Sequence, residues 1–473
     1  MIHIIIKLFG MMLVIYSLKF LGFCEILLWV ISLMSYDELE RLVLYEVKQR
    51  REEGCDVSEV RSALAKIKEK NVSQLMDIME RLSNLNPTPD FPYSEPSILD
   101  EIRKERPRGP RRLSVRMSNS EILDKIYGGW LGRCAGCLLG KPVEGLRREH
   151  IERWLKAADA YPLSDYFPPL RELPEDAESW LKNRISQTEL LRGNIDRMVR
   201  DDDIDYTILN LHVLETYGFE FTTEDIGRAW LSNLPFLRVY TAERVAYKNL
   251  ADGLSPPKTA THMNPYREWI GARIRADTWG YVTPGMPEYG AELAFRDARL
   301  SHVKNGIYGE MFISAMISAA FATNDIDEII SIGLSEIPAN SRLSEAVRDV
   351  VAWRKKYSDW RETWAKINDK YGAYHPIHVI NNTALVILGL LYGEGDFEKS
   401  ITISVMGGWD TDCNGATVGS IVGVMLGAAR LPEKWIAPLN DRVESIISEY
   451  NNSRLSDLAR RTFSHAKKTL ANT

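Results

Sequence analysis

The sequence Gly407-Gly408-Trp409-Asp410-Thr411-Asp412-Cys413-Asn414-Gly415 places two carboxylates two residues apart, directly before an apolar segment. That segment carries a glycine at every fourth position, at 415, 419, 423 and 427. Residues four apart lie on one face of a helix, so the pattern predicts a helix with a stripe of glycines. Far upstream, the glycines at 128, 132, 136 and 140 repeat the same spacing and predict a second helix of this kind.

The two glycine stripes indicate that the helices cross closely. A glycine inside a helix costs about 1 kcal/mol relative to alanine, so a stripe persists where two backbones must approach each other. The upstream helix is expected to begin at Ser118, with Glu121 completing a capping box, and to end at Gly140. If the helices pack antiparallel, Glu144 meets Asp410 and the other acid of its pair at one end. The alternative is that both are ordinary buried core helices.

A second acidic cluster, Asp201-Asp202-Asp203-Ile204-Asp205, precedes another apolar helical segment. Acids are common in a first helical turn because they face the positive end of the helix dipole. Together with the Asp410 pair, however, the cluster predicts a metal site built from carboxylates. Carboxylates without clustered histidines suit hard cations such as Mg²⁺, Mn²⁺ or Ca²⁺.

A zinc site is the alternative. Cys134-x-x-Cys137 and His375-x-x-His378 have spacings that zinc sites use. A single pair of cysteines inside a glycine-striped helix is weak evidence, because cysteine is also a frequent core residue. We therefore expect the cysteines and histidines to be structural.

The composition excludes several classes of protein. With 473 residues, 45% of them hydrophobic and 26% charged, the chain is typical of globular proteins. Its net charge of −6 argues against a dedicated nucleic-acid binder. Five cysteines are few, which indicates a reducing compartment and a cytoplasmic protein. The sequence contains no Walker loop, dinucleotide fingerprint or Ser/His/Asp elbow.

Residues 1–33 are strongly apolar, but Lys7, Lys19 and Glu25 interrupt them. The longest uncharged run is too short for a membrane span of about 20 residues. We interpret 1–33 as an apolar leader or a mis-assigned start, since Ser35 and Glu38 can cap a helix that follows Met34. A membrane anchor is the alternative if residues 1–33 are native.

Three further segments are predicted along the chain. Residues 34–86 read as a helical extension, and residues 87–117 as a proline-rich basic linker. Residues 118–473 form an all-α domain, because no strands alternate with its helical patterns. Within this domain helices are expected at 204–217, 225–233, 302–322, 344–355 and 384–392, and residues 278–287 are expected to form a loop.

The segment from Gly128 to Glu144, GGWLGRCAGCLLGKPVE, resembles the opening motif of the ADP-ribosylglycohydrolases. The runs at 201–207 and 407–416 resemble that family's two metal motifs, in the same order, and the likeness extends over about residues 118–430. The resemblance implies an all-α orthogonal helical bundle that holds two Mg²⁺ or Mn²⁺ ions. It also implies hydrolysis of the glycosidic bond at the ribose anomeric carbon of ADP-ribose adducts.

The resemblance assigns roles to individual residues. Metal ligands fall on both acidic clusters and on the cysteine that follows Asp412. They are Asp201, Asp202, Asp203, Asp410, Asp412 and Cys413. Catalytic roles fall on Glu144, Asp202, Asp203 and Asp410. Glu144 also senses the substrate. A loop that cradles the diphosphate matches Trp269-Ile270-Gly271, with Arg275 following, and a Thr-His pair matches Ser301-His302.

Four residues depart from the family pattern. Asp201 and Cys413 stand where the family has hydroxyl ligands, Cys137 where many members have an aspartate, and Ile204 where they have a second threonine. A thiol is a poor partner for a hard cation. These changes mark a divergent branch. Two other functions therefore stay open: a non-catalytic ADP-ribose-binding or crystallin-like protein, and a metal-dependent phosphoester hydrolase. The leaving group and the oligomeric state also stay open.

Overall fold

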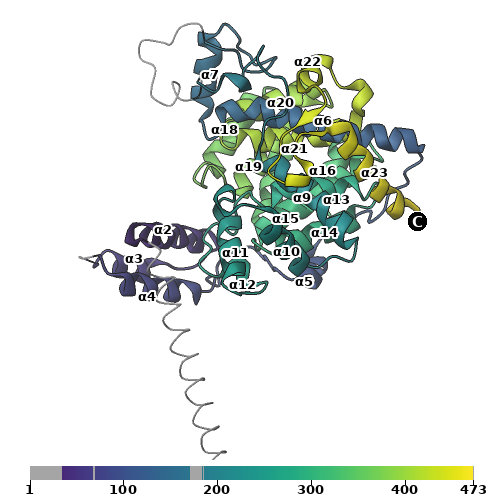
Figure 1. The fold of residues 1–473 in the computed structure, drawn as a ribbon. Helices are drawn as coiled ribbons and strands as arrows, with labels where there is room; N and C mark the ends of the chain where they lie inside the picture. Colours follow the sequence, from purple (N-terminus) through teal and green to yellow (C-terminus); the bar gives the residue numbers. More distant parts are fainter. Residues whose placement is uncertain (1–34, 68–69, 171–183, 185, 472–473) are drawn as a thin grey trace, which may run out of the picture. The chain divides into compact units, whose positions relative to one another are not determined.

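The computed structural model describes residues 35–67, 70–170, 184 and 186–471 (Figure 1). The leader expected at residues 1–33 lies outside this range. The chain divides into two compact units, one ending at Phe91 and the other beginning at Pro92. Among the described residues, no helix combines the length and the apolar character that a membrane crossing requires.

The first unit contains three helices: α2 (Tyr36–Glu52), α3 (Ser58–Leu64) and α4 (Val72–Ser83). Helix α2 begins with the expected capping box, in which Ser35 and Glu38 satisfy each other's backbone N–H groups. Val43 of α2 and Leu75 and Leu82 of α4 are fully buried. A small apolar core therefore holds α2 against α4.

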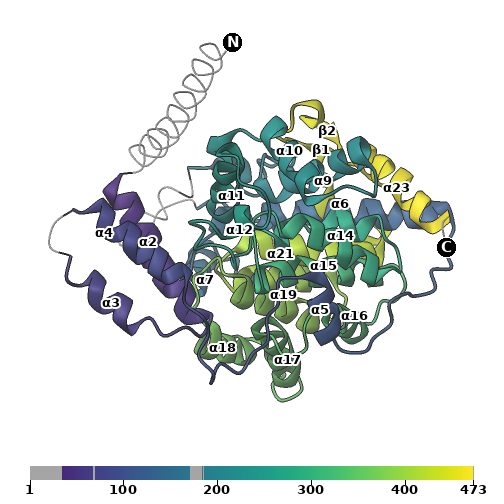
Figure 2. The same ribbon diagram turned by 90° about the horizontal axis from the view of Figure 1, so that it is seen from below.

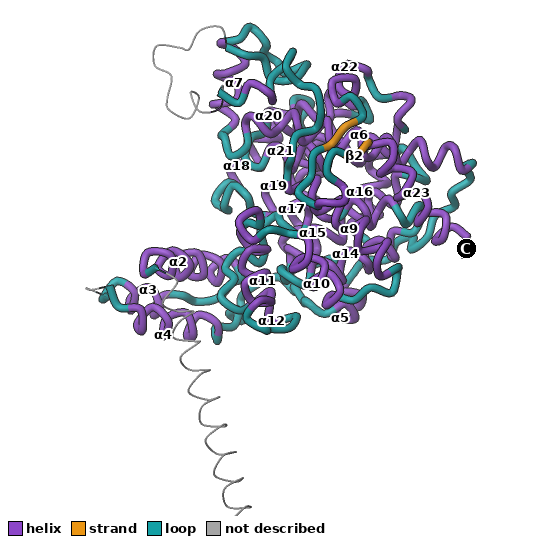
Figure 3. The backbone as a smooth tube through the Cα atoms, in the orientation of Figure 1, coloured by secondary structure: helices purple, strands orange, loops and turns teal. Residues whose placement is uncertain are grey.

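The second unit is all-α, as Figure 3 shows. Its α-helices are α5 (Leu99–Glu105), α6 (Asn119–Gly140), α7 (Arg148–Ala157), α9 (Asp202–Tyr217), α10 (Thr223–Asn233), α11 (Thr241–Ala251), α12 (Lys258–Thr261), α13 (Asp277–Tyr281), α14 (Pro287–Ala298), α15 (Asn305–Ala320), α16 (Ile326–Leu334), α17 (Arg342–Arg354), α18 (Trp360–Tyr371), α19 (Val379–Gly393), α20 (Phe397–Met406), α21 (Thr411–Leu426), α22 (Glu433–Ile436) and α23 (Leu455–Ala471).

Short 3-10 helices and one small sheet complete this unit. The 3-10 helices are η1 (Lys141–Val143), η2 (Thr188–Leu190), η3 (Phe236–Arg238), η4 (Arg273–Arg275), η5 (Ala428–Arg430), η6 (Ala437–Leu439) and η7 (Ser448–Tyr450). Strands β1 (Arg442–Val443) and β2 (Ser453–Arg454) pair antiparallel and form the one sheet found in the described residues.

The two glycine-striped helices, α6 and α21, make the most extensive helix–helix contact in the described residues, and both lie inside the helical body in Figure 2. A Cβ atom added to Gly136 would lie 2.0 Å from the carbonyl oxygen of Gly415, and one added to Gly132 would lie 2.1 Å from that of Gly419. At the two ends of the pair, Gly128 meets Gly423 and Gly140 meets Thr411 in the same way. The order of these contacts confirms an antiparallel crossing that only glycine permits.

The remaining helices surround this pair. Helices α19 and α20 pack against α21, whereas α23 packs against α6. Trp130 of α6 is fully buried, and its ring nitrogen donates a hydrogen bond to Thr462 of α23 at 3.1 Å. The helices expected from the sequence appear as α9, α10, α15, α17 and α19.

The loop expected at 278–287 is shorter in the structure, where only residues 282–286 lie outside a helix. Residues 277–281 form α13, and Pro287 occupies the first turn of α14. A Cβ atom on Gly280 would lie 2.5 Å from the Cβ atom of Ile317, so this glycine serves close packing of α13 on α15. Proline is also favoured in a first helical turn. Gly280 and Pro287, which had indicated a loop, therefore belong to helices.

The basic segment before α6 lies on the second unit. Arg103 pairs with Glu292 at 2.8 Å, and Arg106 and Arg111 pair with the buried Glu336 at 2.6 and 2.8 Å. These basic side chains therefore fasten the segment, including α5, to the helical body.

Candidate functional site

Three segments that are distant in the sequence meet around one cavity of about 350 Å³. The first follows η1 at the end of α6, the second is the start of α9, and the third is the start of α21. The lining residues are Lys141, Glu144, Arg200, Asp202, Asp203, Tyr206, Tyr240, Thr241, Glu243, Ile270, Gly271, Ile274, Ile377, Asp410, Asp412 and Cys413.

Backbone hydrogen bonds fix Glu144 beside Asp410. The N–H of Gly145 donates to the carbonyl of Trp409 at 2.7 Å, and the N–H of Trp409 donates to the carbonyl of Leu146 at 2.9 Å. The segment after η1 and the turn before α21 are thus joined by an isolated antiparallel bridge, between Arg147 and Gly408. The predicted meeting of Glu144 with Asp410 and Asp412 follows from this pairing and from the antiparallel helices.

The start of α9 is held by its own cap and by α6. Asp201 is the N-cap, and its carboxylate accepts from the N–H of Asp203 at 2.9 Å. Arg133 of α6 is fully buried, donates to the carbonyl of Asp203 at 2.7 Å and pairs with Asp277 at 2.8 Å. The glycine-striped helix therefore positions the acidic cluster of α9.

The start of α21 is fixed by Asn382 of α19. Its side-chain oxygen accepts from the N–H of Asp410 at 3.2 Å and from the side chain of Asn414 at 2.8 Å. On the other side, the hydroxyl of Thr411 donates to the carbonyl of Gly140 at 2.8 Å. These hydrogen bonds hold the backbone that carries Asp410 and Asp412 in place.

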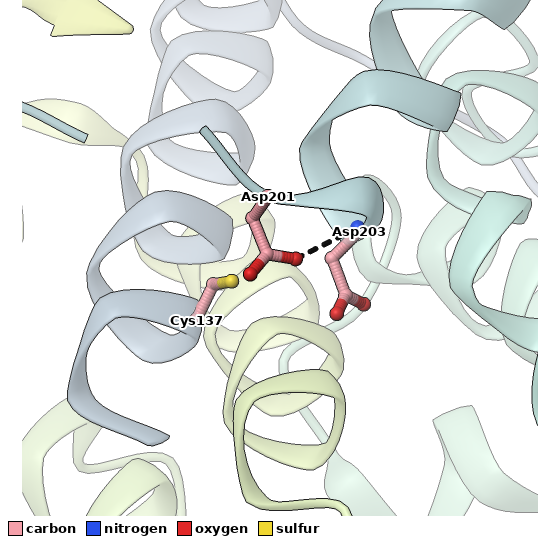
Figure 4. Close-up of side chains that lie close together, drawn as sticks. All are labelled: Cys137, Asp201 and Asp203. Atoms are coloured by element: carbon pink, nitrogen blue, oxygen red, sulfur yellow. Dashed lines mark hydrogen bonds between the residues drawn. The ribbon is translucent and has the colours of Figure 1, made fainter. Parts of the chain in front are cut away.

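Two groups of side chains have a geometry that could hold a metal ion. Cys137, Asp201 and Asp203 form the first group (Figure 4), in which the possible ligand atoms lie within 4.8 Å of one another. The second group, within the same distance, is formed by Glu144 and the two acids of the α21 turn, Asp410 and Asp412.

Asp202 lines the cavity but belongs to neither group. Within the described residues, no histidine is part of either group, so the zinc alternative with His375 and His378 gains no support. Cys134 is fully buried and also stands outside both groups.

The acids carry more negative charge than the surrounding side chains neutralise. Burial and then Asp201 raise the pKa of Asp202 and of Asp203 well above the usual range, and burial followed by Glu144 does the same for Asp412. Burial and then Asp410 raise the pKa of Glu144 to about 7. The Asp412 side chain is 4% exposed, and its Oδ1 has no hydrogen-bond partner. Oxygen donors with surplus charge fit a hard divalent cation.

Asp201 differs from the other acids because its cationic partner, Lys141, outweighs the effect of burial on its pKa. Its Oδ2 accepts from the ammonium of Lys141 in a short ion pair. Burial alone would raise the pKa of Asp201, but Lys141 lowers it below the usual value.

Cys413 lines the cavity as a neutral thiol. Burial raises the pKa of Cys413 well above its usual value, and its Sγ accepts from Arg273 at 3.1 Å. The same guanidinium donates to Asn414 at 2.6 Å, while its Nε and Nη1 have no hydrogen-bond partner among the described residues. A protonated thiol is a weak ligand for Mg²⁺.

Of the expected diphosphate-binding residues, Gly271 lines the cavity but Arg275 does not. Arg275 is fully buried, and it donates to Asp297 and to Glu243 at 3.0 Å each. A Cβ atom on Gly271 would lie 1.9 Å from the carboxylate of Glu243, so this glycine makes room for Glu243 at the cavity wall.

His302 lies outside the lining residues. Its Nδ1 is 2.8 Å from the hydroxyl of Ser301, and burial lowers the pKa of His302 well below its usual value. Three charged lining residues were absent from the expected site: Lys141, Arg200 and Glu243. Lys141 stood inside the glycine motif, whereas nothing near Glu243 in the sequence indicated a site.

The model of the ADP-ribosylglycohydrolase family matches residues 118–469. A solved structure described as "ADP-ribosylglycohydrolase-related protein complex" is 18% identical, with 73% of this chain and 99% of that chain covered and a TM-score of 0.46. No curated protein matches the chain. The family match spans well over half of the sequence, and the chain therefore belongs to the ADP-ribosylglycohydrolase family.

Proposed function

We propose that this protein is a divalent-cation-dependent hydrolase that cleaves the glycosidic bond of ADP-ribosyl or closely related ribosyl adducts at the anomeric carbon. One observation carries the proposal: five acids from three distant segments line a single cavity. They are Glu144, Asp202, Asp203, Asp410 and Asp412. Membership of the glycohydrolase family supports the same reaction class.

Mg²⁺ is the cation that we propose, with Mn²⁺ as the alternative. Glu144, Asp410 and Asp412 would hold it, with Asp202 and Asp203 close by on the same cavity. When bound, such a cation supplies positive charge that orients ribose hydroxyls and a water molecule.

The residues of the chain supply the remaining chemistry. Breaking the glycosidic bond develops positive charge at the anomeric carbon, and the fixed carboxylates stabilise that charge. Glu144 would transfer the proton. Its carboxylate lines the cavity beside Asp410 and Asp412, where it can exchange a proton with a bound substrate or water.

Substrate binding would use other residues of the cavity. Gly271 and Tyr240 line it and would contact the substrate directly. Arg275 would act indirectly, because it donates to Glu243 and so holds that carboxylate against Gly271. His302 would act similarly, through the Ser301 hydroxyl that Arg275 also contacts.

The test is release of ADP-ribose from peptides that carry it on arginine or on serine, measured with Mg²⁺ and with EDTA. We expect release that requires Mg²⁺ and is lost in Asp410→Asn. Asp252→Asn is the matched control, since it removes a carboxylate that is paired with Lys248 away from the cavity.

Failure to release ADP-ribose from either peptide would contradict the proposal. Calorimetric titration with ADP-ribose would then identify a non-catalytic binding protein. Hydrolysis of a nitrophenyl phosphate that depends on Asp410 would instead identify a phosphoesterase.

A further inference from the structure

The family resemblance implies two divalent ions, but the surroundings of Asp201 differ from those of the other acids. Both carboxylate oxygens of Asp201 are engaged: Oδ1 accepts from the N–H of Asp203 at 2.9 Å, and Oδ2 accepts from the Lys141 ammonium. The backbone before Lys141 is held close to α21, because a Cβ atom added to Gly140 would lie 2.2 Å from the carbonyl oxygen of Thr411.

We propose that Lys141 is a resident cation of this site and that the chain binds one divalent ion, at Glu144, Asp410 and Asp412. The inference rests on the metal dependence proposed above. It concerns the number and place of the ions and is tested without substrate.

The first group of possible ligands, Cys137, Asp201 and Asp203, is already supplied with positive charge. A divalent ion bound to Asp201 would lie next to the Lys141 ammonium, and two cations repel each other strongly in a buried site. Arg133 adds a second fixed cation, with Nη2 3.4 Å from the carboxylate of Asp203. The third ligand, Cys137, offers sulfur, which suits a hard cation poorly.

The second group has the opposite character. In the part of the chain that the structure describes, no lysine or arginine forms an ion pair with the carboxylates of Glu144, Asp410 or Asp412. Asp412 is nearly fully buried, lines the cavity and leaves Oδ1 without a hydrogen-bond partner. A buried carboxylate oxygen with no partner is costly unless a cation or proton occupies it. The single divalent ion therefore belongs at this group.

The experiment counts Mn²⁺ ions on the EDTA-treated full-length chain, by calorimetric titration and by electron paramagnetic resonance. The wild type should bind one Mn²⁺ and give the six-line spectrum of an isolated ion. Asp412→Asn should weaken this binding by at least about tenfold. Asp201→Asn should leave one ion bound with little change in affinity, because Asp201 is not a ligand.

Lys141→Met removes the ammonium and keeps the length of the side chain. This variant should gain a second Mn²⁺ and show the spectrum of two coupled ions. Arg200→Met is the matched control, because it removes another cation that lines the cavity but pairs with Asp205. The control should still bind one ion. If Lys141→Met does not fold, the double variant Lys141→Met/Asp201→Asn removes both charges and should bind one ion.

Two coupled ions in the wild type, no bound ion, or loss of the ion in Asp201→Asn would each overturn the inference. Turnover with two ions bound would overturn it and leave the proposed function standing. One bound ion without any turnover would support it and reject the proposed function.

Discussion

Substitutions in the close crossing of α6 and α21 are expected to affect stability and metal binding differently, depending on their position. Gly128 and Gly140 lie at opposite ends of the crossing, and only Gly140 adjoins the acids. A Cβ atom on Gly140 would lie 2.2 Å from the carbonyl oxygen of Thr411 and 2.3 Å from the backbone nitrogen of Asp412. A Cβ atom on Gly128 would lie 2.3 Å from the carbonyl oxygen of Gly423.

The magnitude follows from these distances. Real Cβ atoms do not approach other atoms closer than 3.0 Å, so Gly140→Ala must separate the two backbones by at least about 0.8 Å. Overpacking of this kind costs about 1–3 kcal/mol, and a rigid backbone as the opposing group favours the upper end. Alanine regains less than about 1 kcal/mol in helix propensity. The net loss is about 2 kcal/mol for either variant, or about 2–3 °C in the unfolding temperature of a unit as large as Pro92–Thr473.

The assay is thermal unfolding followed by circular dichroism, together with Mn²⁺ titration. Both variants should unfold earlier than the wild type, but only Gly140→Ala should bind Mn²⁺ more weakly, by at least about tenfold. Gly227→Ala in α10 is the control, because its Cβ atom would meet only the ends of two leucine side chains, Leu250 at 3.1 Å and Leu300 at 3.6 Å. The reasoning is refuted if Gly140→Ala unfolds no earlier than this control, or if it binds Mn²⁺ like the wild type.

Further predictions concern the acids and the thiol. Asp202→Ala and Asp410→Ala should each abolish turnover and leave the helical circular dichroism unchanged; most of the activity surviving in either would remove that acid from the site. In the metal-free protein the pKa values of the acids are raised, to about 7 for Glu144. As the pH falls, the folded state therefore binds protons at a higher pH than the unfolded state does. Its unfolding temperature should therefore rise from pH 8 to pH 6, and Mg²⁺ should stabilise more at pH 8; the opposite trend would show that the acids are not crowded. Cys413→Thr should keep or increase Mg²⁺ affinity, and a clear loss would give the thiol a role of its own. Elemental analysis should find no zinc that survives EDTA dialysis, since stoichiometric zinc would contradict the oxygen-donor site.

Much of the fold could be predicted from local sequence patterns. The spacing of Gly128 to Gly140 and of Gly415 to Gly427 fixed which faces of α6 and α21 meet, because a four-residue period has one meaning in a helix. The capping boxes at Ser35 and Ser118 marked two helix starts that the structure confirms. These features depend on residues close together in the chain, so the sequence alone could predict them.

The rest of the site depends on tertiary contacts that leave no local signal. The ion pair between Lys141 and Asp201 joins residues 60 positions apart. Glu243 reaches the cavity only because Gly271 leaves space for its carboxylate. Arg275 matched a family motif, yet its burial beside Asp297 turns it away from the cavity. The direction in which such side chains point is set by packing and cannot be read from spacing.

The central claim is that Glu144 and the two acids of the α21 turn hold a divalent cation in the cavity, beside the ribose of the substrate. Diffraction from crystals soaked with Mn²⁺ and ADP-ribose, recorded at the manganese absorption edge, tests it most directly. The account predicts an anomalous peak within bonding distance of Glu144, Asp410 and Asp412, with the anomeric carbon of the ribose beside it. A peak away from these three carboxylates, or ADP-ribose bound outside the cavity, would contradict it.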